Sequence, residues 1–260
     1  MDLTDVIGNI PYRLALSGGW IDQTFVSRLH PDPPGAMVVV GLEPRFRFMD
    51  RSGLATSTRK AALRLWNGRI PEGNPETLMR ELYAFENEGR AEPSGSQDMA
   101  GLIYPGISRL DYDPRFEGGI FPARVESLAD TGSADWLEGV LHLLPVNQRP
   151  AGYSPLGTFH PDPAWIRLLG DSGFACFKSI AKRDLAGLGE ALNETMRCWE
   201  TLLPLAVRHP SIDVDLMALW RAYRNHHSGA MFSGCGGGYL IVASEETIPG
   251  SFTIKVRRPA

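Results

Sequence analysis

The sequence predicts an α+β protein built as two lobes, one over residues 1–145 and the other over residues 146–260. Two observations carry this prediction. Strand-like segments and two helices alternate over the first half of the chain, which is typical of a mixed fold. The second half holds two long amphipathic helices, over residues 184–203 and 213–227, followed by a glycine-rich turn and an apolar strand.

Composition and charge are those of an ordinary globular protein. The 260 residues are 43% hydrophobic and 22% charged, which allows a substantial core. The net charge of −4 gives no support for a nucleic acid or a membrane surface as the main partner. Cys176, Cys198 and Cys235 are too few and too widely spaced for a disulfide framework or a zinc site. They fit a reducing cytosol, so we expect a cytoplasmic protein.

The first half begins with strand-like segments. Residues 9–17 alternate polar and apolar side chains from Tyr12 onward and end at Gly18 and Gly19, which predicts a strand followed by a turn. Residues 37–40 form a short apolar run, and residues 45–49 alternate again. Each of these two runs predicts a further strand.

Among the helices predicted in the first half, the one that begins after Asn74 has the clearest boundaries. Asn74 is a good N-cap, Pro75 suits the first turn and Gly89 is a good stop. An apolar stripe facing the core is expected from Leu78, Leu82 and Phe85. Glu86 falls on that same stripe, where an acid is costly unless it is paired, hydrogen-bonded or bound to a metal.

Shorter patterns predict the remaining elements. Strand-like runs occupy residues 104–111, 120–125 and 136–145. Within the last run, residues 137–144 fit a helix and a strand equally well. The run over residues 239–243 is strongly apolar and predicts a central strand.

Two loops are candidates for ligand binding. Residues 52–58 (SGLATST) run from a glycine turn through three hydroxyl residues into a predicted helix over residues 57–66. Free N–H groups and the helix dipole at such a start suit an anion such as phosphate, although plain N-capping explains the stretch by itself. Residues 233–238 (SGCGGG) hold four glycines, more than an ordinary β-turn needs.

Four charged residues are candidate site residues, and each of them also has an ordinary structural explanation. Arg13 lies within the first strand and Asp22 just beyond its turn, where a solvent-facing residue and a turn residue are the alternatives. Glu86 is explained equally well by an ion pair near the helix end. Asp98 follows a Pro/Gly turn, where an N-cap is the alternative.

Taken together, these stretches resemble the GHMP kinase superfamily, named for galactokinase, homoserine kinase, mevalonate kinase and phosphomevalonate kinase. The likeness is greatest to sugar kinases of the heptose-7-phosphate and fucose type. Residues 13–23 (RLALSGGWIDQ) resemble a strand leading to AGGWTD, and residues 52–58 resemble the phosphate loop SGLGSSS. Residues 93–106 (PSGSQDMAGLIYPG) resemble GKQDQYAAAFGG, and residues 233–238 resemble GAGGGG before a strand. The weaker segment 147–156 (NQRPAGYSPL) resembles one with an Arg and a Ser after a strand.

The resemblance implies a two-lobed GHMP kinase-like fold, with a ribosomal S5-like first lobe and a ferredoxin-like second lobe. It implies an ATP-dependent kinase that uses Mg²⁺ and transfers the γ-phosphoryl group to a hydroxyl of a sugar or sugar phosphate. The chain would act as a monomer or homodimer, with no nucleic acid and no membrane as partner. A variant of this hypothesis keeps the family and the kinase activity but has an alcohol other than a sugar as the phosphate acceptor.

The resemblance also implies roles for particular residues. Asp98 would take or orient the proton of the acceptor hydroxyl, and Arg13 would keep Asp98 ionised and stabilise the transferred phosphoryl group. Ser57, with Thr56 as the alternative, and Glu86 would hold Mg²⁺. Gly19 and Asp22 would contact the sugar. The nucleotide would be bound by Gly53, Leu54, Ala55, Thr56, Ser57, Thr58, Ser233, Gly234, Gly236 and Gly237.

Several departures from the family pattern set up a competing hypothesis. Ala55 replaces a loop glycine, and its methyl group narrows the approach to phosphate and resists positive φ. Arg59 and Lys60 replace small residues, and they could bind phosphate or occupy its place. Cys235 replaces an alanine, and the segment over residues 30–51 is shorter than the family's adenine-binding region. A catalytically inactive relative that binds a sugar or nucleotide as a sensor is therefore the alternative function.

Overall fold

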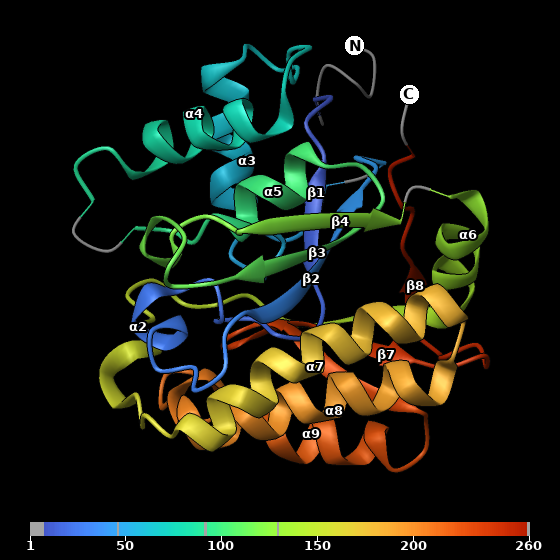
Figure 1. Cartoon of the computed structure of the whole chain (residues 1–260). Coiled ribbons are helices and arrows are strands. Elements are labelled where there is room, and N and C mark those ends of the chain that lie inside the picture. The colour runs from blue at the N-terminus through green and yellow to red at the C-terminus, as the bar shows by residue number, and fades with distance from the viewer. Residues whose placement is uncertain (1–7, 46, 91–92, 129, 259–260) are drawn as a thin grey trace.

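Two four-stranded antiparallel sheets form the framework of the protein (Figure 1). The computed structural model describes residues 8–45, 47–90, 93–128 and 130–258. The first sheet has the order β1-β2-β3-β4, and its strands are β1 (Tyr12–Ala15), β2 (Gly35–Leu42), β3 (Ile107–Tyr112) and β4 (Arg124–Leu128). The second sheet has the order β6-β7-β5-β8, and its strands are β5 (Leu141–Asn147), β6 (Gly229–Gly234), β7 (Gly237–Ala243) and β8 (Phe252–Thr253).

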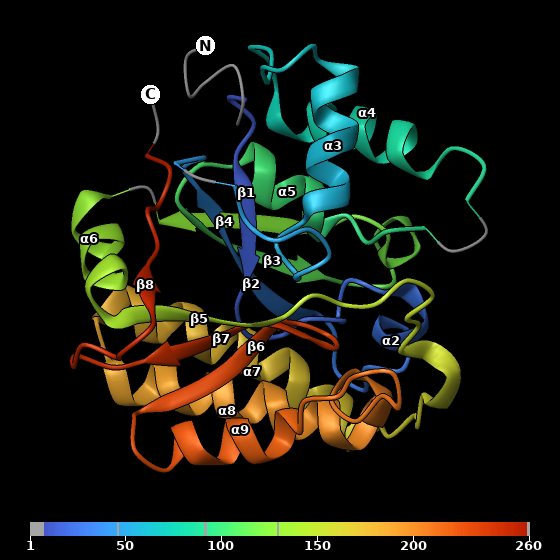
Figure 2. The same ribbon diagram turned by 180° about the vertical axis from the view of Figure 1, so that it is seen from behind.

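Helices cover both sheets and confirm the α+β prediction. Three of them gather beside the first sheet, namely α3 (Thr56–Leu65), α4 (Pro75–Asn87) and α5 (Gln97–Ile103). Three more lie against the second sheet (Figure 2), namely α7 (Pro163–Lys182), α8 (Leu185–Leu202) and α9 (Leu216–Arg224). The remaining helical segments are α2 (Thr24–Ser27), α6 (Thr131–Val140) and the 3₁₀ turns η1 (Glu117–Gly119), η2 (Leu156–Thr158) and η3 (Pro204–Ala206).

Helix α7 has 20 residues and packs against β2 of the first sheet. The contact is close because Gly173 lacks a side chain, and a Cβ there would lie 2.0 Å from the carbonyl oxygen of Ala36. Helix α5 also contacts β2. All eight residues of β2 are buried, which explains why its centre is a continuous apolar run instead of an alternating one.

Helix α4 agrees with its prediction in all but one residue. The side chain of Asn74 accepts hydrogen bonds from the backbone N–H groups of Glu76 and Thr77, at 2.9 and 3.1 Å. Leu78, Leu82 and Glu86 are buried as expected. Phe85 was expected in the core and is 41% exposed, because it lies at the edge of the apolar stripe and not at its centre.

Several sequence-based predictions are wrong in their boundaries or their type. The described residues of the run 45–49 form no strand; residue 46 lies outside the described residues. The ambiguous run 137–144 contains both structures, since α6 ends at Val140 and β5 begins at Leu141. Helix α7 was not predicted, although Asp162 caps it and Pro163 occupies its first turn.

The predicted strand over residues 120–125 begins only at Arg124, and the predicted helix over residues 213–227 is shorter than expected. Asp215 caps that helix by accepting from the backbone N–H of Ala218 at 2.9 Å. By contrast, the long helix predicted over residues 184–203 is confirmed as α8, with Asp184 as its N-cap.

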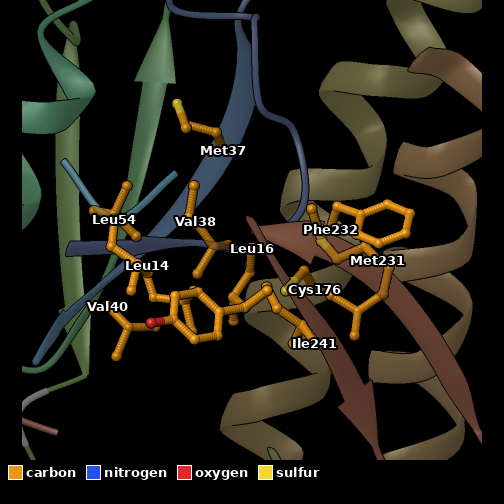
Figure 3. Close-up of a cluster of buried hydrophobic side chains, with 14 of the residues drawn as sticks. Leu14, Leu16, Met37, Val38, Val40, Leu54, Cys176, Met231, Phe232 and Ile241 are labelled. Atoms are coloured by element: carbon orange, nitrogen blue, oxygen red, sulfur yellow. The ribbon is translucent and has the colours of Figure 1, made fainter. Parts of the chain in front are cut away.

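One hydrophobic core joins the two sheets (Figure 3). Side chains from β1, β2 and the segment before α3 meet side chains from α7, β6 and β7. The buried residues labelled there are Leu14, Leu16, Met37, Val38, Val40, Leu54, Cys176, Met231, Phe232 and Ile241. The predicted lobe boundary after residue 145 falls inside β5, and the division into two lobes stays a prediction.

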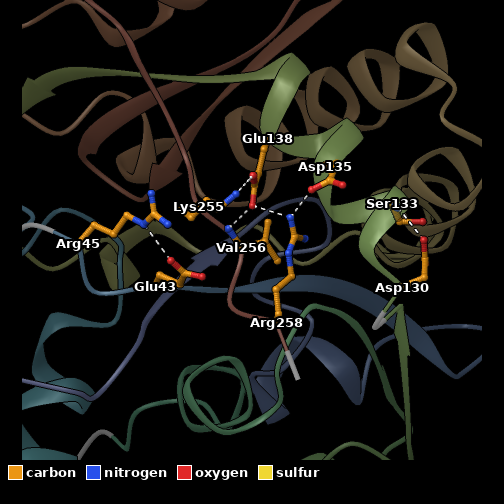
Figure 4. A network of polar contacts seen from close by, with 9 residues as sticks. All are labelled: Glu43, Arg45, Asp130, Ser133, Asp135, Glu138, Lys255, Val256 and Arg258. Carbon is orange, nitrogen blue, oxygen red and sulfur yellow. Dashed lines mark hydrogen bonds and ion pairs between the residues drawn. The ribbon is translucent and has the colours of Figure 1, made fainter. Parts of the chain in front are cut away.

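A polar network attaches the C-terminal segment to α6 (Figure 4). Glu138 accepts from Lys255 Nζ at 2.5 Å, from the backbone N–H of Val256 at 2.9 Å and from Arg258 Nη2 at 3.0 Å. Val256 also forms a β-bridge with Leu42 at the end of β2. The chain beyond β8 thus connects the two sheets. Among the described residues, no helix combines the length and the apolar character that crossing a bilayer requires.

Candidate functional site

The site is centred on a buried ion pair between Arg13 on β1 and Asp98 in the first turn of α5. Arg13 Nη2 pairs with Asp98 Oδ1, and Arg13 Nη1 donates to the carbonyl oxygen of Gly53 at 3.2 Å. The side chains of Arg13 and Asp98 are only 5% and 16% exposed. Burial lowers the pKa of Arg13 to about 10, so this arginine stays charged at neutral pH.

The position of Arg13 depends on a glycine in α5. A Cβ at Gly101 would lie 1.9 Å from Arg13 Cγ, so the missing side chain leaves room for the arginine stem to cross the helix. The alternative of a solvent-facing strand residue is wrong, because Arg13 is 4% exposed. The N-cap alternative for Asp98 is also wrong: Ser96 occupies the N-cap position, and Asp98 lies within the helix.

The loop before α3 (residues 52–55) leads into the helix without a side chain that caps the first backbone N–H groups. Ala55 occupies the N-cap position with φ of 52° and forms no capping hydrogen bond, so plain N-capping does not explain the hydroxyl residues. Thr58 Oγ1 donates to Asp98 Oδ2 at 3.4 Å, and Thr56 Oγ1 accepts from the backbone N–H of Arg51 at 3.1 Å. Ser57 is exposed at the helix start.

The glycine-rich loop packs directly against this loop. Ser233 Oγ donates to the carbonyl oxygen of Ser52 at 2.6 Å and accepts from the backbone N–H of Tyr239 at 3.0 Å. A Cβ at Gly53, whose φ is 80°, would lie 2.4 Å from the carbonyl oxygen of Ser233. A Cβ at Gly238 would lie 2.1 Å from the Ser52 oxygen. The two loops thus touch through backbone atoms, which only glycine permits here.

The rest of the glycine-rich loop is attached to the second sheet. Gly234 pairs with Gly237 across the β6–β7 turn, and the backbone N–H of Gly236 donates to the carbonyl oxygen of Ala206 at 2.6 Å. Asn147 at the end of β5 donates to the Gly236 carbonyl at 2.9 Å. These contacts hold the turn in place beside the loop before α3.

Asp22 is a second buried carboxylate near Arg13. It is 3% exposed, and a Cβ at Gly95 would lie 1.7 Å from its Oδ2 atom. Burial raises the pKa of Asp22 to about 6, and the nearby charge of Arg13 opposes that rise. Asp22 therefore belongs to the same electrostatic cluster as the Arg13–Asp98 pair.

The turn that carries Asp22 and Gly19 is anchored by two tryptophans, a role that no sequence pattern predicted for them. Trp199 on α8 donates from Nε1 to the carbonyl oxygen of Gly19 at 3.0 Å. Trp20, whose φ is 88°, donates from Nε1 to Cys235 Sγ at 2.8 Å. Tryptophan in this left-handed region is strained, so this contact helps hold the turn against the glycine-rich loop.

Glu86 on α4 offers an unused acceptor. Its side chain is fully buried; Oε1 lies 3.3 Å from Arg90 Nη1, while Oε2 has no hydrogen-bond partner among the residues that the structure describes. The ion-pair explanation is therefore correct for one oxygen only. A free carboxylate oxygen of this kind fits Mg²⁺. Within the described ranges, no three His, Cys, Asp or Glu side chains cluster closely enough to hold a metal.

The two cations that follow the loop do not occupy it. Arg59 Nε donates to the carbonyl oxygen of Ile10 at 2.8 Å, and its guanidinium group lies 4.3 Å from the ring centre of Tyr12. Lys60 Nζ pairs with Asp50 Oδ2 at 2.9 Å. Both side chains are engaged away from the Arg13–Asp98 pair.

Sequence comparison gives little family information. No protein-family model matches the chain. The tyrosine recombinase XerC of Mesorhizobium japonicum is 26% identical over 179 residues, covering 66% of this chain and 55% of the recombinase. The chain thus spans about half the length of the curated relative it matches. At that identity the match assigns no family.

Solved structures match nearly the whole chain. A D-glycero-D-manno-heptose 1-phosphate kinase from Bacteroides thetaiotaomicron superposes with a TM-score of 0.58 at 11% identity, covering 97% of this chain and 96% of that one. Lactococcus lactis galactokinase complexed with galactose superposes with a TM-score of 0.59 at 11% identity, covering 92% of this chain and 85% of the galactokinase. Streptococcus pneumoniae phosphomevalonate kinase in complex with phosphomevalonate and AMPPNP gives 0.58 at 11% identity, with 92% of each chain covered. The chain therefore has the fold of the GHMP kinases, as its ordered motifs predicted.

Proposed function

We propose that the protein is an ATP-dependent kinase that phosphorylates a hydroxyl group of a sugar or sugar phosphate. The observation that carries the proposal is the Asp98 carboxylate, which contacts both Arg13 and Thr58 at the start of the uncapped helix α3. A carboxylate, a cation and free backbone N–H groups thus converge. These are the groups that phosphoryl transfer needs.

Each group would have a defined task in the transfer. The acceptor hydroxyl would lose its proton to Asp98 as its oxygen attacks the γ-phosphorus, and ADP would leave. Arg13 would stabilise negative charge on the phosphoryl oxygens. The backbone from Gly53 to Thr58 would bind the other phosphates, and the contact with residues 233–238 would keep that loop in shape.

The metal would be Mg²⁺, held by Ser57 and by the free Oε2 atom of Glu86. It would neutralise charge on the phosphates of the nucleotide. Gly19 and Asp22 would contact the acceptor, and the buried Asp22 carboxylate would accept a hydrogen bond from a hydroxyl of the sugar. We place the protein in the cytoplasm, as a monomer or homodimer without a nucleic-acid or membrane partner.

The test is ADP release with Mg-ATP across a panel of sugars and sugar phosphates. Asp98→Asn should lower kcat by roughly 10²–10⁴-fold on any accepted substrate, since a general base contributes about that much. AMP-PNP binding should change little. Asp213→Asn, an exposed site at the surface, is the matched control and should keep full activity. Unchanged turnover in Asp98→Asn would remove the base assignment.

A second function, an inactive binding protein, is favoured by one observation. Ala55 keeps a methyl group at the left-handed position that precedes α3, where phosphate would approach. Calorimetry separates the two functions. Sugar or nucleotide binding without ADP release on any acceptor would support the sensor, and absence of both ATP binding and turnover would exclude the kinase.

A further inference from the structure

The cations around the loop before α3 fall into two groups. Some of them pair with an acid, namely Arg13 with Asp98, and Arg47 and Lys60 with Asp50. Arg51 and Arg149 differ, because neither forms an ion pair with any acid in the described part of the chain. Two arginines without a carboxylate thus lie next to a candidate phosphate site.

Each of these two arginines donates to a backbone carbonyl in or next to the other. Arg149 Nε donates to the carbonyl oxygen of Arg51 at 3.0 Å, and the Arg149 backbone N–H donates to the same oxygen at 3.3 Å. Arg51 Nη2 donates in return to the carbonyl oxygen of Pro150. Each guanidinium group is therefore positioned through one nitrogen, and its other N–H groups have no hydrogen-bond partner among the described residues, which leaves them available for a ligand.

Arg149 is further fixed by the glycine-rich loop. Its Cγ atom lies 3.1 Å from where a Cβ of Gly236 would be, so the missing side chain leaves room for the arginine stem. The guanidinium carbon lies 5.8 Å from the ring centre of Tyr153, whose hydroxyl donates to the Leu205 carbonyl at 3.1 Å. A cation on a fixed aromatic ring is already oriented before any ligand arrives.

Arg149 lies close to the turn that carries Asp22, because its stem packs against Gly236, and the neighbouring Cys235 accepts a hydrogen bond from Trp20 of that turn at 2.8 Å. After burial and the opposing charge of Asp22, its charge is the next cause that lowers the pKa of Arg13. It also opposes the burial that raises the pKa of Cys235, which contacts Trp20. The charge of Arg149 thus reaches Arg13 at the centre of the site and Cys235, which contacts the turn proposed to bind the acceptor.

We propose that Arg149, with Arg51 beside it, forms a subsite for the phosphate group of the acceptor, so that the acceptor is a phosphorylated small molecule. The inference rests on the proposed kinase function, whose choice between sugar and sugar phosphate it decides. Neighbouring guanidinium groups without an acid repel one another and Arg13, and a bound phosphate dianion relieves that repulsion. Arginine also matches phosphate geometry with paired N–H donors.

The first experiment measures binding without nucleotide. Mannose 6-phosphate, mannose 1-phosphate, inorganic phosphate and neutral mannose are titrated calorimetrically into the protein. We expect at least one phosphorylated sugar to bind about tenfold or more tightly than mannose, since a hydrogen bond to a charged group contributes at least this factor. Equal affinity for the phosphorylated and neutral sugars would overturn the proposal.

The second experiment uses variants of the two arginines. Arg149→Gln should lose tenfold or more in sugar-phosphate affinity, Arg51→Gln should lose less, and Arg149→Lys should recover part of the loss because it keeps the charge. Arg64→Gln, which removes an exposed arginine from the far end of α3, is the matched control and should bind as the wild type does. Thermal melts identify any variant that fails to fold. If Arg149→Gln does not fold, the affinity of Arg51→Gln for the sugar phosphate is the decisive measurement.

Binding of Mg-AMP-PNP to the same variants distinguishes the acceptor from the nucleotide. We expect Arg149→Gln to change AMP-PNP affinity by less than threefold. A tenfold loss there, with sugar-phosphate binding intact, would assign the cations to the nucleotide and overturn the proposal. If no acceptor is phosphorylated but sugar-phosphate binding depends on Arg149, the kinase function fails while the subsite stands. Turnover of neutral sugars that is unaffected by Arg149→Gln rejects the subsite and leaves the kinase.

Discussion

The carboxyl group of Asp22 is buried, so water solvates its charged form poorly. Burial raises the pKa of Asp22 from 3.8 to about 6, although the positive charge of Arg13 lowers this pKa in part. Because the folded-state pKa is above the ordinary value, the folded protein binds the proton more tightly than the unfolded chain. Stability from this group is complete below about pH 4 and is lost as the pH rises through about 6.

We therefore expect Asp22→Asn to have a flatter stability profile than the wild type. Between pH 4 and pH 7 the wild type should lose up to about 3 kcal/mol relative to the variant, from the shift of roughly two pKa units. Urea unfolding at several pH values measures the difference. A constant gap between the two proteins over this range would contradict a raised pKa. The variant should also lose acceptor affinity if Asp22 contacts the sugar.

At the scale of elements, the contact between the loop before α3 and the glycine-rich loop depends on backbone conformation. Gly53 and Ala55 both have positive φ, 80° and 52°, but they meet different surroundings. A Cβ at Gly53 meets the Ser233 carbonyl at 2.4 Å, whereas Ala55 already carries a methyl group in a left-handed conformation. Substitutions at the two positions should therefore act in opposite directions.

Gly53→Ala should destabilise the protein by about 2 kcal/mol, because the new methyl group must push the two loops apart. Ala55→Gly should stabilise it by up to about 1 kcal/mol, since glycine removes the left-handed penalty and loses part of that gain to its greater freedom in the unfolded chain. Urea midpoints measure both. Destabilisation by Ala55→Gly would show that the Ala55 methyl group contributes packing that outweighs its strain.

The same pair of variants affects the proposed nucleotide site. Ala55→Gly should tighten Mg-AMP-PNP binding because it opens the approach to the backbone N–H groups at the start of α3. Gly53→Ala should weaken it. Calorimetric titration at one temperature and salt concentration compares the two with the wild type.

At the scale of the whole molecule, α7 connects the two sheets. It packs with α8 beside the second sheet and also contacts β2 in the first. Gly170 and Gly173 of α7 both face β2 closely, since a Cβ at Gly170 would lie 2.8 Å from the Cα of Gly35. The integrity of the site thus depends on a helix that contributes no predicted site residue.

We expect Gly173→Ala to lower the thermal midpoint by roughly 10 °C, from a loss of about 3 kcal/mol, because backbone atoms of Ala36 cannot move aside. Gly139→Ala in α6 is the matched control. Apart from its chain neighbours and the backbone of its own helix, no described atom lies within 4 Å of its new Cβ, so it should stabilise the helix by about 0.5–1 kcal/mol. Equal effects of the two substitutions would show that the α7–β2 approach is not restrictive.

The amino-acid sequence by itself determined the local elements with clear signals. Helix α4 was predicted from Asn74 and Pro75, and α8 from its apolar stripe, because caps and periodicity act within a few residues. The ordered motifs predicted the fold, and they assigned residues of the segments 52–58 and 233–238 to one nucleotide site. The structure brings these two segments into contact, while their role stays a prediction.

Only the tertiary structure decided which interpretation of the charged residues holds. Arg13 crosses α5 because Gly101 is small, and Glu86 keeps one oxygen without a partner. Arg51 and Arg149 become neighbours although 98 residues separate them. Such contacts depend on how distant elements pack, and no local pattern encodes them. Local propensity therefore set the helices and strands, while long-range packing set the charges and the geometry of the site.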